Sequence, residues 1–216
     1  MIVNAWGIVL ARRPHGEADR LCTIYTETMG KLLVRFVGVN KPGRKLKALS
    51  EPLCWGEYRL YVSARTDVAK AIGGRLIGTF PSIRSELSRT VAALGCCELL
   101  SYLSADRAAN PEEYALLCGA LQALEAAPSP WLAEAFGLRL LELAGYGLTE
   151  RHAGADAPLW DTLSRSTWAE LAALPWEAQA AGRLRQAVLD HAEAQSGRPL
   201  KTRAFLDGLE PQPAAL

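Results

Sequence analysis

The apolar residues of this 216-residue chain change their spacing once, at Pro81, and this change limits the fold more than any other feature. Before Pro81, short runs rich in β-branched and aromatic residues alternate between apolar and polar, as with Leu32, Val34 and Phe36 in one run. After Pro81, apolar residues recur every three or four positions. Alternation places one side of a strand in a core, whereas the longer period places one side of a helix there. The sequence therefore predicts an α+β chain, with a β domain over 1–80 and an α-helical domain over 81–216.

Five strands are predicted in the first 80 residues. We expect them at 2–13, 21–26, 31–39 and 53–63, with a weaker fifth strand from the turn at 64–66 to about 80. Five strands at this spacing fit a small five-stranded β-barrel. The predicted helices cover about 83–104 with Ser82 as the N-cap, a stretch opened by Pro111, and then 129–144, 168–174, 177–195 and a short turn at 202–209. Residues 145–166 are predicted to be irregular.

Charge divides the chain at the same point. Residues 1–80 hold 13 Lys and Arg against 6 Asp and Glu, whereas residues 81–216 hold 11 against 17. The net charge of +1 therefore hides a basic part and an acidic part. Such asymmetry favours a basic module that faces an anionic partner, joined to an acidic module with another task. Uneven surface charge without any consequence is the alternative.

Motifs of catalysis and metal binding are missing. The three histidines, at 15, 152 and 191, have no zinc-protease spacing, and no Gly-x-Ser-x-Gly or Gly-x-Gly-x-x-Gly sequence occurs. Residues 38–43 have the glycine spacing of a phosphate loop but lack its Lys-Ser/Thr ending. The five cysteines, an odd number without a Cys-x-x-Cys pair, predict neither a disulfide framework nor a structural zinc site. We expect no enzyme activity, no cofactor or metal, no leader or membrane segment, and a reducing cytoplasm.

A cluster of cations follows the third predicted strand. Residues 41–47 hold four cations in seven positions. Cations that neutralise phosphates release counterions, so such a loop favours salt-sensitive binding of nucleic acid without regard to its sequence. The predicted phosphate-facing surface consists of Lys31, Arg35, Lys41, Arg44, Lys45 and Lys47, with Arg12, Arg13 and Arg65 as weaker candidates. A solvated loop is the alternative.

Aromatic residues of the same part could stack unpaired bases. On the predicted strand 53–63, Trp55 and Tyr61 share a face with Arg59, and Trp6 and Tyr25 are further candidates. Small barrels bind single strands by stacking bases on aromatic side chains within a basic groove. For each aromatic residue the alternative is packing in a core or between domains.

Several short motifs follow one another along nearly the whole chain. They are His15-Gly16-Glu17-Ala18-Asp19-Arg20-Leu21, Thr26-Glu27 with Gly30-Lys31-Leu32, the Gly-rich basic stretch 38–47, Glu98-Leu99-Leu100, residues 136–141 with Gly145-Tyr146, and Leu200-Lys201-Thr202-Arg203. In this order, with strands before helices, they resemble the bacterial RecO family of recombination mediators. Two features depart from that family. Many members hold a four-cysteine zinc ribbon where residues 146–165 contain no cysteine, and the basic loop lacks their Lys-Ser-Arg-like stretch.

The resemblance implies an OB-fold in the N-terminal barrel and a helical C-terminal domain, here without the zinc ribbon. It also implies binding of single- and double-stranded DNA, annealing of complementary strands, and help in loading a recombinase onto strands coated by single-strand-binding protein, alongside the partner RecR. We expect a protein of DNA repair and recombination that is cytoplasmic and associated with the nucleoid. Packing by Leu159, Trp160 and Leu163 is expected to replace the ribbon.

A second basic cluster lies near the end of the chain. Arg198, Lys201 and Arg203, close to Phe205 and Leu206, are predicted to receive an acidic peptide tail that ends in an apolar residue. Ordinary surface charge is the alternative. Two other functions stay open for the whole chain. One is an RNA-binding OB-fold accessory protein, because composition does not reveal which sugar a small barrel prefers. The other is an adaptor whose basic face meets an acidic protein and no nucleic acid.

Overall fold

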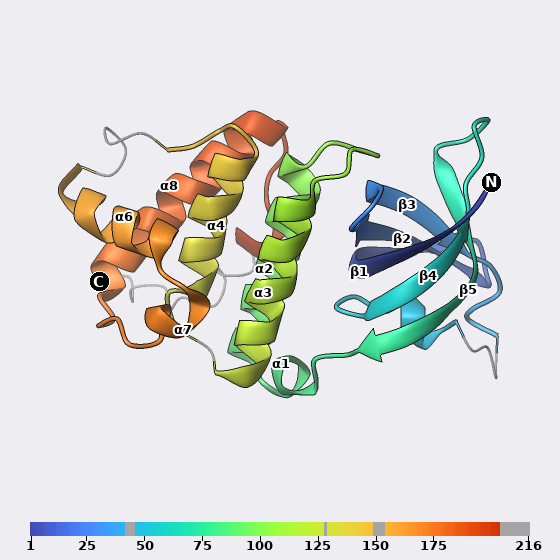
Figure 1. The fold of residues 1–216 in the computed structure, drawn as a ribbon, viewed down its shortest axis with the longest axis horizontal. Helices are drawn as coiled ribbons and strands as arrows, with labels where there is room; N and C mark the ends of the chain where they lie inside the picture. Colours follow the sequence, from blue (N-terminus) through green and yellow to red (C-terminus); the bar gives the residue numbers. More distant parts are fainter. Residues whose placement is uncertain (42–45, 128, 149–153, 204–216) are drawn as a thin grey trace, which may run out of the picture.

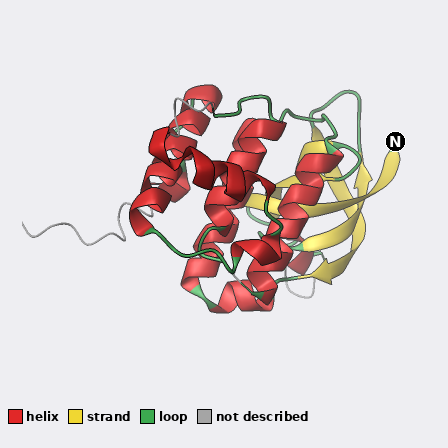
Figure 2. Cartoon of the chain, turned by 60° about the vertical axis from the view of Figure 1, so that its left-hand side comes forward, coloured by secondary structure: helices red, strands yellow, loops and turns green. Residues whose placement is uncertain are grey.

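A computed structural model describes residues 1–41, 46–127, 129–148 and 154–203. Its N-terminal part is a closed barrel of five strands, and helices pack against one side of it (Figures 1 and 2). The strands are β1 (Ile2–His15), β2 (Asp19–Thr26), β3 (Gly30–Phe36), β4 (Trp55–Tyr61) and β5 (Val68–Gly78). They follow the order β1-β2-β3-β5-β4 around the barrel, and only β3 and β5 pair in parallel. The predicted α+β fold with an N-terminal OB-type barrel is confirmed.

The barrel core follows the alternation of the sequence. Leu32, Val34 and Phe36 point inward and are buried, while Arg35 between them is exposed. Phe36 packs edge-on against the buried ring of Tyr58, with the ring centroids 6.3 Å apart. One side of each strand therefore fills the barrel, and the other side of β3 and β4 can carry polar and basic residues, whereas β2 is buried on both sides.

The helices form a bundle around one central helix. α4 contacts four other helices: α2, α3, α6 and α8. Asn110 caps α3 by accepting hydrogen bonds from the N–H groups of Glu112 and Glu113, so this helix begins at Pro111 as predicted. The helical segments are η1 (Ala48–Ser50), α1 (Pro81–Ser85), α2 (Leu87–Leu103), α3 (Pro111–Ala126), α4 (Leu132–Leu143), η2 (Gly154–Asp156), α6 (Ala157–Arg165), α7 (Trp168–Leu171) and α8 (Ala178–Ser196).

The sequence predicted one helix over 83–104, but the structure has two helices there, α1 and α2. Glu86 adopts an extended conformation, with φ −127° and ψ 124°, and separates α1 from α2. Ser82 is not the N-cap either, because Phe80 holds that position. The N–H groups of Ser82 and Ile83 each donate to the Glu125 carboxylate at 3.0 Å. A carboxylate from α3 thus satisfies donors that a local cap would otherwise serve.

The prediction that residues 145–166 are irregular is wrong over the second half of that range. α6 occupies Ala157–Arg165, with Pro158 in its first turn. Trp160 and Leu163 lie three positions apart and are both buried in the helical core, and Leu159 is partly buried against it. These three residues were expected to provide packing here, and they do so from a helix.

The helical core extends onto one side of the barrel, next to a separate apolar cluster that fills the barrel itself. Ile8, Leu10, Tyr25 and Leu53 of the barrel part belong to the same buried cluster as the residues of α2, α3 and α4. These four side chains are not part of the cluster inside the barrel, and the helices remove them from water. Among the described residues, no helix combines the length and the apolar composition that a membrane crossing requires.

Candidate nucleic-acid interface

The connection between β3 and β4 folds against the β1–β2 hairpin. The Asn40 N–H donates to the Ala18 carbonyl at 3.0 Å, and the Gly38 N–H donates to Asp19 Oδ1 at 2.7 Å. The hairpin also contains the C-terminal part of β1, so several predicted cations come together at this end of the barrel. We call this surface the basic end; it consists of Arg12, Arg13, Arg35, Lys41 and Lys47.

A buried arginine fastens this connection to the barrel. Arg20 donates to Asn40 Oδ1 at 2.9 Å, to Ser50 Oγ at 3.0 Å and to Glu51 Oε1 at 2.6 Å. The second oxygen of Glu51 lies 3.2 Å from Nε of Arg12. Sequence reasoning did not assign Arg20 a role. The alternation along β2 was the sequence signal that could have found it. This alternation places Arg20 on the inner side of the barrel, where it pairs with the inward-facing Phe36.

Asp19 binds the other side of the same connection. Its Oδ2 accepts from Nε of Arg35 at 2.7 Å and lies 2.6 Å from Nη2, while its Oδ1 accepts from the Gly38 N–H. The Gly38 N–H and the Arg35 guanidinium hold the pKa of Asp19 below its ordinary value, against the opposing effect of burial. The charges of Arg12 and Arg35 are therefore partly balanced within the basic end.

The other cations of the basic end are not balanced by the described residues. Arg13, Lys41 and Lys47 are exposed, and none of their side chains has a hydrogen-bond or ion-pair partner within the described part of the chain. The predicted site residues Arg44 and Lys45 lie outside the described residues. The acids of this end thus engage Arg12, Arg20 and Arg35 and leave positive charge exposed.

Two predicted site residues lie away from the basic end. Lys31 is largely enclosed, and its Nζ donates to the carbonyls of Ser101 at 2.5 Å and Ser104 at 2.7 Å, near the end of α2. Its charge therefore joins the barrel to the helices. Arg65 is exposed on the turn between β4 and β5, next to Thr66, whose carbonyl accepts from Arg107 at 2.9 Å. The Arg107 N–H in turn donates to the Lys31 carbonyl, which places this turn near the start of β3.

The four candidate aromatic residues differ in exposure. Trp55 is half-buried, and its Nε1 donates to the Tyr114 hydroxyl at 3.1 Å, so it packs at the contact with α3. Tyr25 is fully buried. Tyr61 and Trp6 are 48% and 41% exposed and point outward. The structure therefore presents Tyr61 and Trp6 to solvent and uses Trp55 and Tyr25 for packing.

Strand register connects the basic end to Tyr61. Arg13 pairs with Leu21, Leu21 with Arg35, Arg35 with Lys70, and Lys70 with Tyr61. Paired residues point to the same side of a sheet, so this row runs across the outside of the barrel. Lys70 was not a predicted site residue. Its place beside Arg35 depends on the parallel pairing of β3 and β5, which no local pattern of the sequence reveals.

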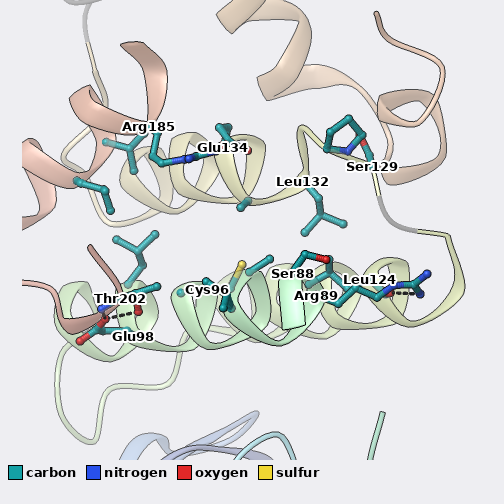
Figure 3. A pocket seen from close by; sticks show the side chains of 18 of the residues that line it. Ser88, Arg89, Cys96, Glu98, Leu124, Ser129, Leu132, Glu134, Arg185 and Thr202 are labelled. Atoms are coloured by element: carbon teal, nitrogen blue, oxygen red, sulfur yellow. Dashed lines mark hydrogen bonds and ion pairs between the residues drawn. The ribbon is translucent and has the colours of Figure 1, made fainter. Parts of the chain in front are cut away.

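A groove lies on the helices, between α2, α4 and α8 (Figure 3). It has a volume of about 790 Å³ and a mainly apolar lining. The buried Glu134 and the partly exposed Arg185 point toward one another there, with Nη2 of Arg185 and Oε1 of Glu134 2.6 Å apart. Oε2 of Glu134 has no hydrogen-bond partner among the described residues, and burial raises the pKa of this carboxyl.

The predicted peptide-binding cluster lies beside this groove but does not form one site. Leu200 and Thr202 line the groove, and the carboxylate of Glu98 accepts from the N–H groups of Lys201 and Thr202. Arg203 is engaged by Asp190 at 2.7 Å and Glu193 at 2.9 Å. The side chains of Arg198 and Lys201 are exposed, and Arg198 borders a separate polar cleft near β3. Phe205 and Leu206 lie outside the described residues.

The cysteines contribute to packing. Cys22, Cys54, Cys96 and Cys97 are buried, and burial raises the pKa of Cys22 to about 12. The thiol of Cys54 donates to the Ala48 carbonyl at 2.9 Å, which helps to hold the β3–β4 connection. In the part of the chain that the structure describes, no three His, Cys, Asp or Glu side chains gather as a metal site. That the protein needs no zinc stays a prediction.

Comparison with known proteins agrees with this arrangement. The family models for the N-terminal and C-terminal parts of recombination protein O match residues 1–80 and 84–155. The chain is 30% identical over 149 residues to the DNA repair protein RecO of Clostridium perfringens, which covers 68% of this chain and 60% of that relative. It is 31% identical over 146 residues to the same protein of an Exiguobacterium species, covering 67% and 58%. The chain thus spans about 60% or less of the length of these relatives. Because the two matched segments together cover well over half of the residues, the chain belongs to the RecO family.

Proposed function

We propose that this chain acts in DNA repair and recombination by binding single- and double-stranded DNA through the basic end of its barrel. It would anneal complementary strands and help to load a recombinase onto strands coated by single-strand-binding protein, with RecR as a further partner. The relatives that carry the name DNA repair protein RecO support the process. The observation that carries the binding proposal is the exposure of Arg13, Lys41 and Lys47 without partners among the described residues.

Annealing follows from charge neutralisation and requires no bond to be made or broken. Two complementary strands repel one another through their phosphates, and cations on one surface reduce this repulsion. Phosphate contacts position a strand without reading its sequence and leave the base edges free to pair. The acidic helical part, with 11 cations against 17 acids over residues 81–216, would not attract a second strand.

Charge reversal at two exposed lysines tests this proposal. We expect Lys41→Glu/Lys47→Glu to weaken binding to every DNA sequence alike and to reduce the slope of log affinity against log salt by about 1.4 for a single strand. The measurement is fluorescence anisotropy across a salt series with a labelled strand of ~30 nucleotides, longer than the ~4–16 that one OB-fold covers. Arg165→Glu/Arg183→Glu makes the same charge change on exposed arginines of the helical part and should leave the slope unchanged.

Three outcomes separate the candidate functions. An unchanged slope in the lysine variant would show that the basic end does not bind DNA. Preference for RNA over DNA of matched sequence would favour the RNA-binding alternative, because the 2′-hydroxyl lets a protein distinguish the two. No binding of either at low salt, with a protein partner retained after nuclease treatment, would favour the adaptor alternative.

We propose a second role for the helices: an acidic peptide tail places its last, apolar side chain in their groove, and its acidic residues extend outside the groove to Lys201 and Arg198. The resemblance to the RecO family suggests single-strand-binding protein as its source. The apolar lining suits the last side chain of the tail, and the exposed Arg198 and Lys201 suit its acidic residues. Long-range attraction by such exposed charges is sensitive to salt.

A peptide titration tests the second role. A labelled peptide of Asp residues ending in Phe should bind, and the same peptide ending in Gly should bind more weakly. Arg198→Glu/Lys201→Glu should weaken binding of the Phe-ended peptide. The affinity for DNA should stay unchanged, because neither residue belongs to the basic end. Equal binding of the two peptides would exclude the groove as the site.

A further inference from the structure

The outer side of β4 and its two neighbours is a second unusual surface. β4 lies between β1 and β5 (Figure 1), and its outward residues align with theirs in rows. We call this surface the β4 face; its rows are Ile2–Tyr61–Lys70, Asn4–Arg59–Gly73 and Trp6–Glu57–Arg75. Within the described part of the chain, exposed large apolar and aromatic side chains gather on these three strands, namely Ile2, Trp6, Tyr61, Ile72, Leu76 and Ile77. By register only Ile2, Trp6 and Tyr61 of these belong to the rows of the β4 face, because Leu76 pairs with the inward-facing Gly56 and the register shifts at Ile72 and Ile77. Exposed rings of this size on a sheet are candidates for a binding surface.

The charges of the β4 face are mainly positive and mostly unpaired. The side chains of Arg59 and Lys70 are exposed and have no hydrogen-bond or ion-pair partner among the described residues. Arg75 is 71% exposed and only 3.5 Å from Glu57, the one acid in these rows. Gly73 stands beside Arg59, and a Cβ added there would lie 3.7 Å from Cβ of Arg59. Gly73 therefore leaves no side chain on β5 beside Arg59. The row of Arg59 lies between the row of Tyr61 and the row of Trp6.

Charge complementarity and strand register identify the occupant. Unpaired cations next to exposed rings suit a polyanion with accessible π-faces, which is a single-stranded nucleic acid. The row Arg13–Leu21–Arg35–Lys70–Tyr61 aligns this face with the basic end, although Leu21 in the row is buried, and it places Lys70 directly between Arg35 and Tyr61. A protein partner would suit the aliphatic residues equally well, but it would not account for the unpaired cations or for this alignment.

We propose that a single strand crosses the β4 face, with unpaired bases stacked on Tyr61 and Trp6 and phosphates held by Arg59 and Lys70. This inference rests on the proposed DNA-binding function and extends it. A duplex keeps its bases inside its own stack, so it can use the cations of the basic end but not these rings. The two surfaces therefore have different roles. The basic end binds both forms of DNA, and the β4 face binds unpaired bases selectively.

The test compares single-stranded and duplex DNA of equal length at one salt concentration. Tyr61→Leu should weaken single-strand binding about tenfold and duplex binding by less than about twofold, because only the stacked base loses its contact. Trp6→Leu should act in the same direction, and Tyr61→Phe should retain binding because the ring remains. Tyr146→Leu is the matched control, since Tyr146 is 40% exposed near the end of α4. Circular dichroism establishes that each variant is folded.

The outcomes distinguish this inference from the function on which it rests. A selective loss of single-strand binding in Tyr61→Leu and Trp6→Leu, absent in Tyr146→Leu, supports the β4 face. The inference is overturned if neither variant changes the affinity for DNA, or if both variants lose duplex and single-strand binding equally. Either result leaves the proposal for the basic end unaffected. If wild-type protein binds neither form of DNA, the proposed function fails, and the inference fails with it.

Discussion

Asp19 shows how one residue can position a binding surface without joining it. The carboxylate accepts from the Gly38 N–H and from Arg35, and its pKa is lowered in the folded chain. A carboxyl whose pKa falls on folding stabilises the fold above its ordinary pKa, about 3.9 for Asp, and loses this effect as the pH falls through the lowered value. We expect Asp19→Asn to be less stable than wild type at about pH 7, with the difference shrinking towards about pH 3. Urea denaturation at several pH values measures this.

The matched control for Asp19 is an exposed aspartate. Asp161 lies 2.8 Å from Arg165 one helical turn away, and both side chains are more than half exposed. Exposed ion pairs contribute little to stability, so Asp161→Asn should show no comparable pH-dependent difference. Equal stability of Asp19→Asn and wild type at neutral pH would show that the Gly38 and Arg35 contacts do not hold the β3–β4 connection in place.

Sequence reasoning at the scale of residues was limited by long-range packing. The exposure of Lys41 and Lys47 could be predicted, because a run of cations has no other stable place than the surface. The enclosed positions of Lys31 and Trp55 could not, because they depend on where α2 and α3 dock. Both residues have outward-facing places on their strands, and only the contact with the helices removes them from solvent.

Elements could be predicted where their signals are local. α3 begins at Pro111 because Asn110, Glu112 and Glu113 all lie within one turn of its start. The N–H groups at the start of α1 are instead satisfied by Glu125, 43 residues from Ser82, so its boundary has no local signature. α6 lies between these cases. Its spacing of Trp160 and Leu163 was present in the sequence, but nine residues are too few for a clear helical period.

The strand order of the barrel could not be predicted from local signals either, because it depends on pairing between distant segments. Hairpin pairs such as β1–β2 and β2–β3 follow from short turns. The parallel pairing of β3 with β5 joins segments separated by β4 in the sequence, and it decides that Lys70 stands beside Arg35. The row that connects the basic end to Tyr61 exists only because of this pairing. The sequence could therefore predict which cations belong to the candidate site, but not that Arg35, Lys70 and Tyr61 are aligned across paired strands.

At the scale of the whole molecule, barrel and helices are joined by a buried polar cluster within the core that extends from the helices onto the barrel. The Glu113 carboxylate, 5% exposed, accepts from the Tyr25 hydroxyl and from Ser104 Oγ, the latter at 2.6 Å. Glu113→Ala would leave two buried hydroxyl groups without their acceptor, at about 1–3 kcal/mol for each. We expect a lower free energy of unfolding and a single transition, because Tyr25 and α3 pack in one core. Tyr25→Phe removes one donor and should cost less.

Hydrogen exchange determines whether this coupling is real. If barrel and helices unfold as one unit, the slowest amides of β2 and α2 should exchange faster by the same factor in Glu113→Ala. Glu112→Ala is the matched control, because Glu112 is the exposed neighbour at the start of α3 and should change exchange little. Faster exchange in the helices alone, with β2 unchanged, would show that the barrel is stable by itself. Coupled exchange would mean instead that the proposed DNA-binding surface of the barrel depends on the helices for its stability, so a partner bound to the helices could stabilise that surface from a distance.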